Sequence, residues 1–156
     1  MGELLGNVYS SLFEEWYSVD LSDYIWGVMS PAQTANLYVN FGLVMLILTL
    51  ISGIVYYFVL DRHSWSHWWS WGIAMMVPAI MNFAYGYSVL ANQYNEGLMI
   101  DQKQNELGFS TIDFVNFGIC NLLMSIIVFV LFTLVVKFLF KFTPLQSDCS
   151  KAPFCK

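Results

Sequence analysis

A chain of 156 residues has room for one domain, and only 11% of its residues are charged whereas 58% are hydrophobic. A soluble domain carries roughly 25% charged residues, so this composition excludes an ordinary water-facing surface and predicts an integral membrane protein. The net charge of −5 argues against nucleic acid as a partner, because binding to nucleic acid depends on Lys and Arg side chains that neutralise phosphates.

Residues 1–36 form the first predicted segment, which is an amphipathic N-terminal stretch. Apolar side chains recur at helical spacing over residues 5–19, and glutamates and serines interrupt them on the other face. This pattern predicts an interfacial helix along one membrane surface, which either anchors the chain in lipid or packs on neighbouring subunits. We expect a break at 20–23, where Ser22 or Asp23 would cap a second short helix.

Three long apolar stretches follow, over residues 37–60, 68–90 and 112–139. A helix of about 20 apolar residues crosses the ~30 Å hydrocarbon core of a bilayer, so each stretch is long enough to span it. We therefore predict an all-α integral membrane protein with three transmembrane helices. The transmembrane domain covers 37–142, and a short polar tail covers 143–156.

The basic residues predict the orientation of the spans. With three spans, the loop after the first span and the C-terminal tail share one side of the membrane. The opposite side has a single basic residue, Lys103. The first side has five, which are Arg62, Lys137, Lys141, Lys151 and Lys156. The positive-inside rule then predicts a cytoplasmic C-terminus and an external N-terminus, and we expect the membrane to be a bacterial inner membrane.

Tryptophans gather around the start of the second span. They are Trp65, Trp68, Trp69 and Trp71. Amphipathic rings prefer the headgroup zone of a bilayer, so we interpret this group as an aromatic belt. A ligand-stacking site is the less favoured alternative.

Polar side chains share one broad face of the third span, and another lies in the second span. These candidate residues are Asp113, Asn116, Cys120, Asn121 and Ser125, together with Asn82. Polar groups in hydrocarbon are costly unless they find partners or water. The face therefore either joins helices or lines an aqueous path between copies of the chain. Pro78 interrupts the second span and is either a gate hinge or a feature of helix shape.

Candidate chemistry is sparse elsewhere in the chain. His63 and His67 have a spacing that suits a metal, but no third ligand lies nearby in the sequence, so we predict no metal site. Cys149 and Cys155 lie in the tail and are expected to be thiols if the tail is cytoplasmic. The sequence has no phosphate-binding loop and no nucleophile elbow, so we predict neither an enzyme nor a cofactor.

These features favour two functions of different classes. Three spans cannot enclose a conducting path in one chain without turning polar faces to lipid, so a channel would be a homo-oligomer. The leading hypothesis is a small channel or membrane-permeabilising effector. Its layout is similar to that of one class of phage holins, and a bacterial defence effector that depolarises the cell would use the same physics. The alternative is a structural or anchoring subunit that binds a soluble or membrane protein partner.

Overall fold

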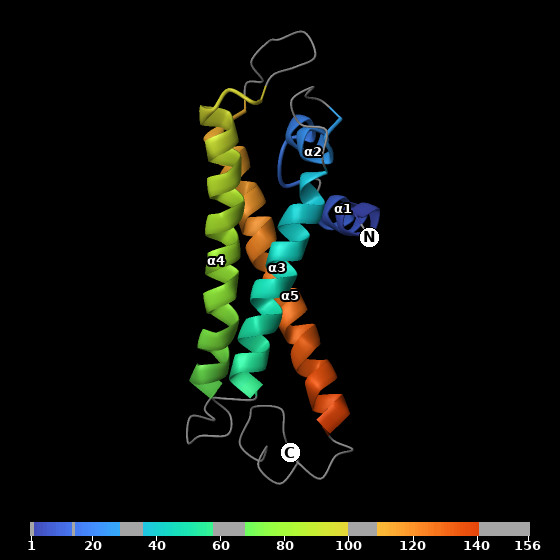
Figure 1. Ribbon diagram of the computed structural model, residues 1–156, viewed down its shortest axis with the longest axis vertical. Helices are drawn as coiled ribbons and strands as arrows, with labels where there is room; N and C mark the ends of the chain where they lie inside the picture. The colour runs from blue at the N-terminus through green and yellow to red at the C-terminus, as the bar shows by residue number, and fades with distance from the viewer. Residues whose placement is uncertain (1, 14, 29–35, 58–67, 100–108, 141–156) are drawn as a thin grey trace.

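The computed structural model describes residues 2–13, 15–28, 36–57, 68–99 and 109–140 (Figure 1). In these ranges the regular structure is all helical. The helices are α1 (Gly2–Phe13), α2 (Val19–Trp26), α3 (Leu37–Val55), α4 (Trp68–Asn95) and α5 (Thr111–Phe140). The predicted all-α fold is confirmed. The polar tail and the loop that contains Arg62, His63, Trp65 and His67 lie outside the described residues.

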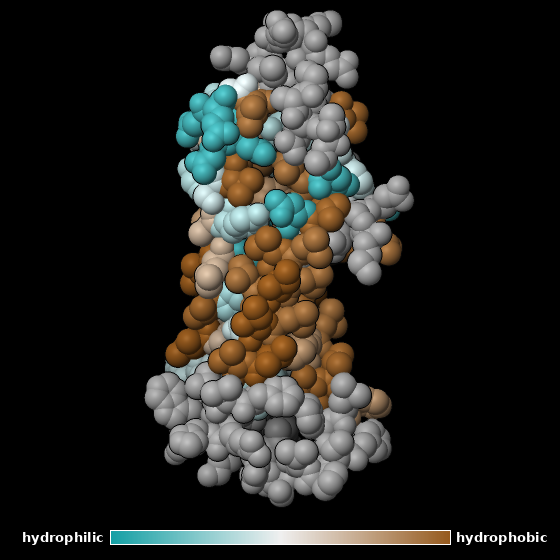
Figure 2. All heavy atoms as spheres, viewed as in Figure 1, coloured by the Kyte–Doolittle hydropathy of each residue, from teal (hydrophilic) through white to brown (hydrophobic). Residues whose placement is uncertain are grey.

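Helices α3, α4 and α5 are long and apolar enough to cross a membrane. The 19 residues of α3 measure about 28 Å at 1.5 Å per residue, close to the ~30 Å core of a bilayer. The 28 residues of α4 and the 30 of α5 exceed that thickness. Figure 2 shows the resulting apolar surface along the middle of the bundle. The chain is therefore a membrane protein with three spanning helices, as predicted.

The three spans run side by side, and α1 and α2 lie across one end of them (Figure 1). We call this end the α1/α2 end; it holds the start of α3, the end of α4 and the start of α5. With 12 residues, α1 is only about 18 Å long and is too short to span a bilayer. Within the described residues, the predicted amphipathic N-terminal segment forms two short helices that pack against α3.

The break between α1 and α2 comes earlier than predicted. α1 ends at Phe13, and Ser18 caps α2 by accepting a hydrogen bond from the backbone N–H of Leu21. The prediction that Ser22 or Asp23 caps this helix is wrong, because Ser18 accepts from the free N–H of Leu21 and both residues lie inside the helix. Ser22 is instead buried within α2.

Glycines in the left-handed conformation end both α2 and α4. Gly27 has a φ of 80°, and its N–H and that of Val28 return to carbonyls in the last turn of α2. Gly97 has a φ of 67°, and the N–H groups of Gly97 and Leu98 do the same after α4. A residue with a side chain is strained at such a φ, which is why glycine sits at these ends.

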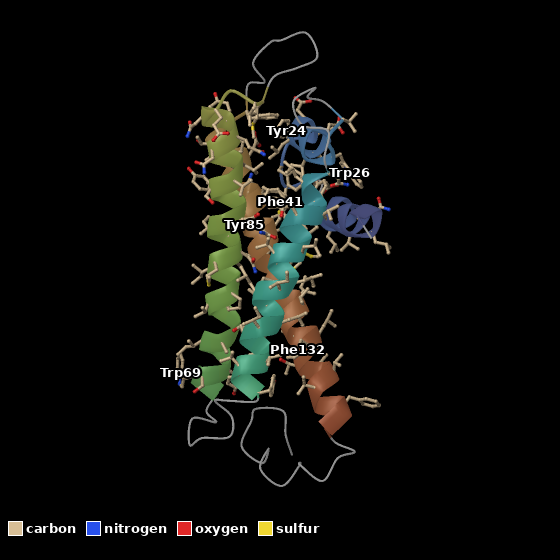
Figure 3. The ribbon with its side chains drawn as sticks, in the orientation of Figure 1. Tyr24, Trp26, Phe41, Trp69, Tyr85 and Phe132 are labelled. Carbon is tan, nitrogen blue, oxygen red and sulfur yellow. The ribbon has the colours of Figure 1, made fainter. Side chains whose placement is uncertain are left out.

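Aromatic rings fill the space between the N-terminal helices and the spans. Tyr9 of α1 packs against Tyr38 of α3 and Phe117 of α5, with ring centroids 5.6 and 6.3 Å apart. Phe41 packs against Phe117 at 4.9 Å. These rings belong to the main core cluster, so one continuous apolar core joins the N-terminal helices to the transmembrane bundle. Figure 3 shows Tyr24, Trp26, Phe41 and Tyr85 in this upper part of the molecule.

Candidate functional site, a buried polar network

Five polar side chains from four helices meet inside the bundle. The Tyr9 hydroxyl donates to Asn121 Oδ1 at 2.6 Å, and Asn121 Nδ2 donates to the backbone carbonyl of Asn82 at 2.8 Å. Asn82 Nδ2 donates to Ser125 Oγ at 3.1 Å, and the hydroxyls of Ser125 and Thr49 are 2.9 Å apart. All five residues have 0% exposure. We call this set the buried polar network; it joins α1, α3, α4 and α5.

The spacing of Asn121 and Ser125 explains how α5 bonds three neighbouring helices, α1, α3 and α4, at once. Residues four apart lie on one face of a helix, a turn apart, and this face of α5 packs against α3 and α4. Gly86 allows α4 to approach the Asn121 amide closely, because a Cβ at this position would lie 3.3 Å from Asn121 Nδ2. The sequence placed Asn82, Asn121 and Ser125 on candidate faces, and the structure brings the three together.

Two members of the network were missed by the sequence analysis. Tyr9 was counted among the apolar side chains of the N-terminal stretch, and Thr49 was not among the candidate residues. A signal for Tyr9 was present, because a tyrosine on the buried face of a helix usually finds a partner for its hydroxyl. Nothing in the sequence indicated that this partner lies 112 positions away in α5.

Asn82 Oδ1 is the weak point of the network. It is buried, and no residue in the described part of the chain donates a hydrogen bond to it. A buried acceptor without a donor costs on the order of 1–3 kcal/mol. The network therefore stabilises the packing of four helices while leaving one amide oxygen unsatisfied among these residues.

The other candidate residues on the third span have different surroundings. Cys120 is fully buried in the main core cluster. Asn116 is half-buried. Asp113 lies in the first turn of α5, where its Oδ2 accepts from the N–H of Ser110 while Ser110 Oγ accepts from the N–H of Ile112. This reciprocal arrangement is a capping box, so Asp113 helps to begin the helix.

Pro78 is tied to the neighbouring span. Proline has no N–H, so it cannot bond the carbonyl four residues earlier, which belongs to Ala74. Ser52 of α3 donates its hydroxyl to this carbonyl at 2.7 Å. The bond replaces the missing helical hydrogen bond and links α3 to α4 at the position that the sequence indicated as a hinge or shape feature.

The tryptophans of the predicted belt have different environments. Trp69 is 80% exposed at the end opposite α1 and α2 (Figure 3), whereas Trp71 is 9% exposed and packs on Phe129. The Trp71 indole N–H donates to Thr133 Oγ1 at 3.4 Å. Trp71 thus belongs to a helix interface. The side chain of Trp68 and all of Trp65 lie outside the described atoms.

A second set of hydroxyl contacts fixes α2. The Tyr17 and Tyr38 hydroxyls are 2.8 Å apart, and Ser22 Oγ is 3.1 Å from the Tyr38 hydroxyl. Tyr24 donates to Gln93 of α4 at 3.4 Å. Burial raises the pKa of Tyr24 and, more strongly, that of Tyr9, so both phenols are neutral at physiological pH.

The network supplies hydrogen bonds and carries no charge. Its members are amides and hydroxyls, and within the described ranges no group of three or more His, Cys, Asp or Glu residues is arranged to hold a metal ion. The fold and the network together define a three-span helical membrane protein whose spans are joined by internal hydrogen bonds. Comparisons with protein-family models, with curated proteins and with solved structures find no match.

Proposed function

We propose that this chain is a non-conducting structural or anchoring subunit, which holds the α1–α2 segment at one membrane face for a protein partner. The observation that carries this proposal is the closure of the buried polar network within a single chain. Asn82, Asn121 and Ser125 are hydrogen-bonded to one another or to Tyr9 and Thr49, with none of them exposed. Each of them already has a partner within the chain, and among the described residues only Asn82 Oδ1 is left without a donor.

The outward surface of the spans supports the same proposal. The exposed residues over 43–55 of α3, 73–81 of α4 and 127–135 of α5 are all apolar. An oligomer of such surfaces would bring apolar side chains together, whereas an aqueous pore between copies needs polar ones. Exposed polar residues of the spans, such as Asn40 and Ser88, lie toward the α1/α2 end.

The surface offered to a partner would be the α1–α2 segment. It combines exposed apolar side chains, Trp16 and Val19, with the acidic residues Glu15 and Asp20, which are also exposed. Under the orientation that the basic residues predict, this surface faces the outside of the cell. The channel or permeabilising effector remains the competing hypothesis, and it requires the network to open so that Asn82 and Asn121 meet water.

Ion flux in reconstituted liposomes tests the proposal. The wild-type chain should release no more potassium than protein-free liposomes, while a channel-forming peptide serves as the positive control. Wild-type conductance that is lost in the double variant Asn82→Leu, Asn121→Leu would overturn the proposal and identify these residues with a pore.

A photo-crosslinking experiment in native membranes tests the partner surface. A photoreactive amino acid at Trp16 should form an adduct with a different polypeptide, and the same group at Ile47, which faces lipid, should not. An adduct at Trp16 that contains only a second copy would favour a homo-oligomer and contradict the anchoring role.

A further inference from the structure

Helix α1 has three faces. Its contact face, Gly6, Tyr9 and Phe13, is buried against the rest of the chain, and a Cβ added at Gly6 would strike the Trp26 ring. At about 100° per residue, the remaining surface divides into two flanks. The aliphatic flank is Leu4, Val8 and Leu12, which are 69%, 39% and 53% exposed. The polar flank includes Asn7 and Ser11, both exposed.

The contacts that α1 makes with α3 and α5 fix its depth in the membrane. Tyr9 packs on Tyr38, which lies in the first turn of α3. Because α3 is about as long as the hydrocarbon core is thick, its first turn marks one edge of that core. The Tyr9 hydroxyl reaches further in, to Asn121, which is the eleventh residue of α5. Helix α1 therefore lies across the bundle at the edge of the hydrocarbon (Figure 1).

Helix α1 lies at the level where the exposed surface of α3 changes from polar, at Asn40, to apolar, at Leu43. Exposed apolar residues of α3 continue from this level toward the opposite end, beginning with Leu43 and Ile47. The aliphatic flank of α1 has no charged residue, and its middle residue, Val8, lies about 60° around the helix from Ser11 and about 100° from Asn7. The two flanks therefore adjoin, as on a helix that lies in the membrane plane with its polar side toward the headgroups. A flank that faced water would leave three large aliphatic side chains without cover.

We propose that the aliphatic flank of α1 is a lipid-binding surface that inserts among the acyl chains of one leaflet, and that the Tyr9–Asn121 hydrogen bond holds it there. The polar flank faces the headgroups. As a result, the protein occupies more area in the leaflet at the α1/α2 end, where α1 and α2 join the three spans, than in the other leaflet. This inference goes beyond the anchoring function and stands whether or not a protein partner exists.

Site-directed spin labelling of the full-length chain tests the inference. In a background with Cys120→Ala, Cys149→Ser and Cys155→Ser, labels are placed by Val8→Cys and Leu12→Cys. The matched control is Ser11→Cys on the polar flank of the same helix. Collision of each label with oxygen, which concentrates in acyl chains, is compared with collision with a water-soluble nickel chelate in liposomes.

The ratio of oxygen to nickel accessibility should be several-fold higher at positions 8 and 12 than at position 11. Equal ratios dominated by the nickel chelate would place α1 in water and overturn the inference. Low accessibility to both reagents at positions 8 and 12 would also overturn it, because protein would then cover the flank. In that case, dipolar broadening between labels would identify the cover as a second copy.

Discussion

Asn121 takes part in two links of the buried polar network, one to Tyr9 and one to the Asn82 carbonyl. Hydrogen bonds between membrane helices contribute only about 0.6 kcal/mol on average. Removal of Asn121 also leaves the buried Tyr9 hydroxyl without its acceptor, and an orphaned polar group costs about 1–3 kcal/mol. The orphaned group is therefore the larger effect.

We accordingly predict that Asn121→Leu lowers the free energy of unfolding by about 1–3 kcal/mol. Asn116→Leu is the matched control, because Asn116 is half-buried on the same helix and makes no hydrogen bond within the described ranges. It should change stability by less than about 0.5 kcal/mol. Unfolding in mixed detergent micelles, followed by circular dichroism, measures both. Similar values for the two variants would show that the network does not stabilise the fold.

Because the Tyr9 hydroxyl is buried, we predict that alkaline pH lowers the stability of the fold. Desolvation by burial, with smaller contributions from Cys120 and Tyr38, raises its pKa above the ordinary value of 10.0. Because the folded-state pKa is raised, the contribution of Tyr9 to stability is fully present below pH 10 and is lost as the pH rises toward the folded-state pKa. The wild-type chain should lose stability above about pH 10 more steeply than Tyr9→Phe. Parallel pH profiles of the two proteins would refute this prediction.

At the scale of the helices, Ser52 and Pro78 act as a pair. The Ser52 hydroxyl bonds the Ala74 carbonyl, which Pro78 leaves without a helical donor. We predict that Ser52→Ala costs about 1 kcal/mol in the wild-type chain. It should cost less in the Pro78→Ala background, where the new N–H of residue 78 can bond the same carbonyl. A double-mutant cycle of unfolding free energies measures the coupling, and additive effects would contradict the compensation.

Helices α4 and α5 pack closely at Gly118, whereas Gly72 of α4 has open space beside it. We therefore predict that alanine substitutions at the two glycines change stability in different ways. A Cβ at Gly118 would lie 2.9 Å from the Phe83 ring and 3.3 Å from its carbonyl, whereas a Cβ at Gly72 meets nothing within 4 Å. Gly118→Ala should destabilise the bundle by about 1–3 kcal/mol through overpacking. Gly72→Ala should be neutral or stabilising by up to about 1 kcal/mol, because alanine favours the helix. Equal thermal stability of the two variants would contradict the packing.

At the scale of the whole molecule, the sequence was sufficient for the spans but not for their contacts. Three long apolar stretches predicted the three helices, because length and hydropathy alone decide whether a segment crosses a bilayer. The polar face of the third span was also predictable, because its residues recur at helical spacing. Its partners depend on how helices far apart in the chain pack, and the pairing of Tyr9 with Asn121 has no local signal. The boundary between α1 and α2 was misplaced because several residues there, Ser18 among them, are able to cap a helix.

The central claim is that the part of the α5 polar face that holds Cys120, Asn121 and Ser125 is closed inside one chain and does not meet water. Cys120 reports on it directly, because this native thiol lies next to Asn121 and is fully buried. In the variant with Cys149→Ser and Cys155→Ser, Cys120 is the single thiol left in the chain. Its reaction with a small charged methanethiosulfonate reagent is measured in liposomes and again after unfolding in dodecyl sulfate.

The account predicts that Cys120 stays unmodified in the folded protein and reacts fully once the chain is unfolded. Rapid modification in intact liposomes would mean that water reaches this face of α5, and it would contradict a closed network.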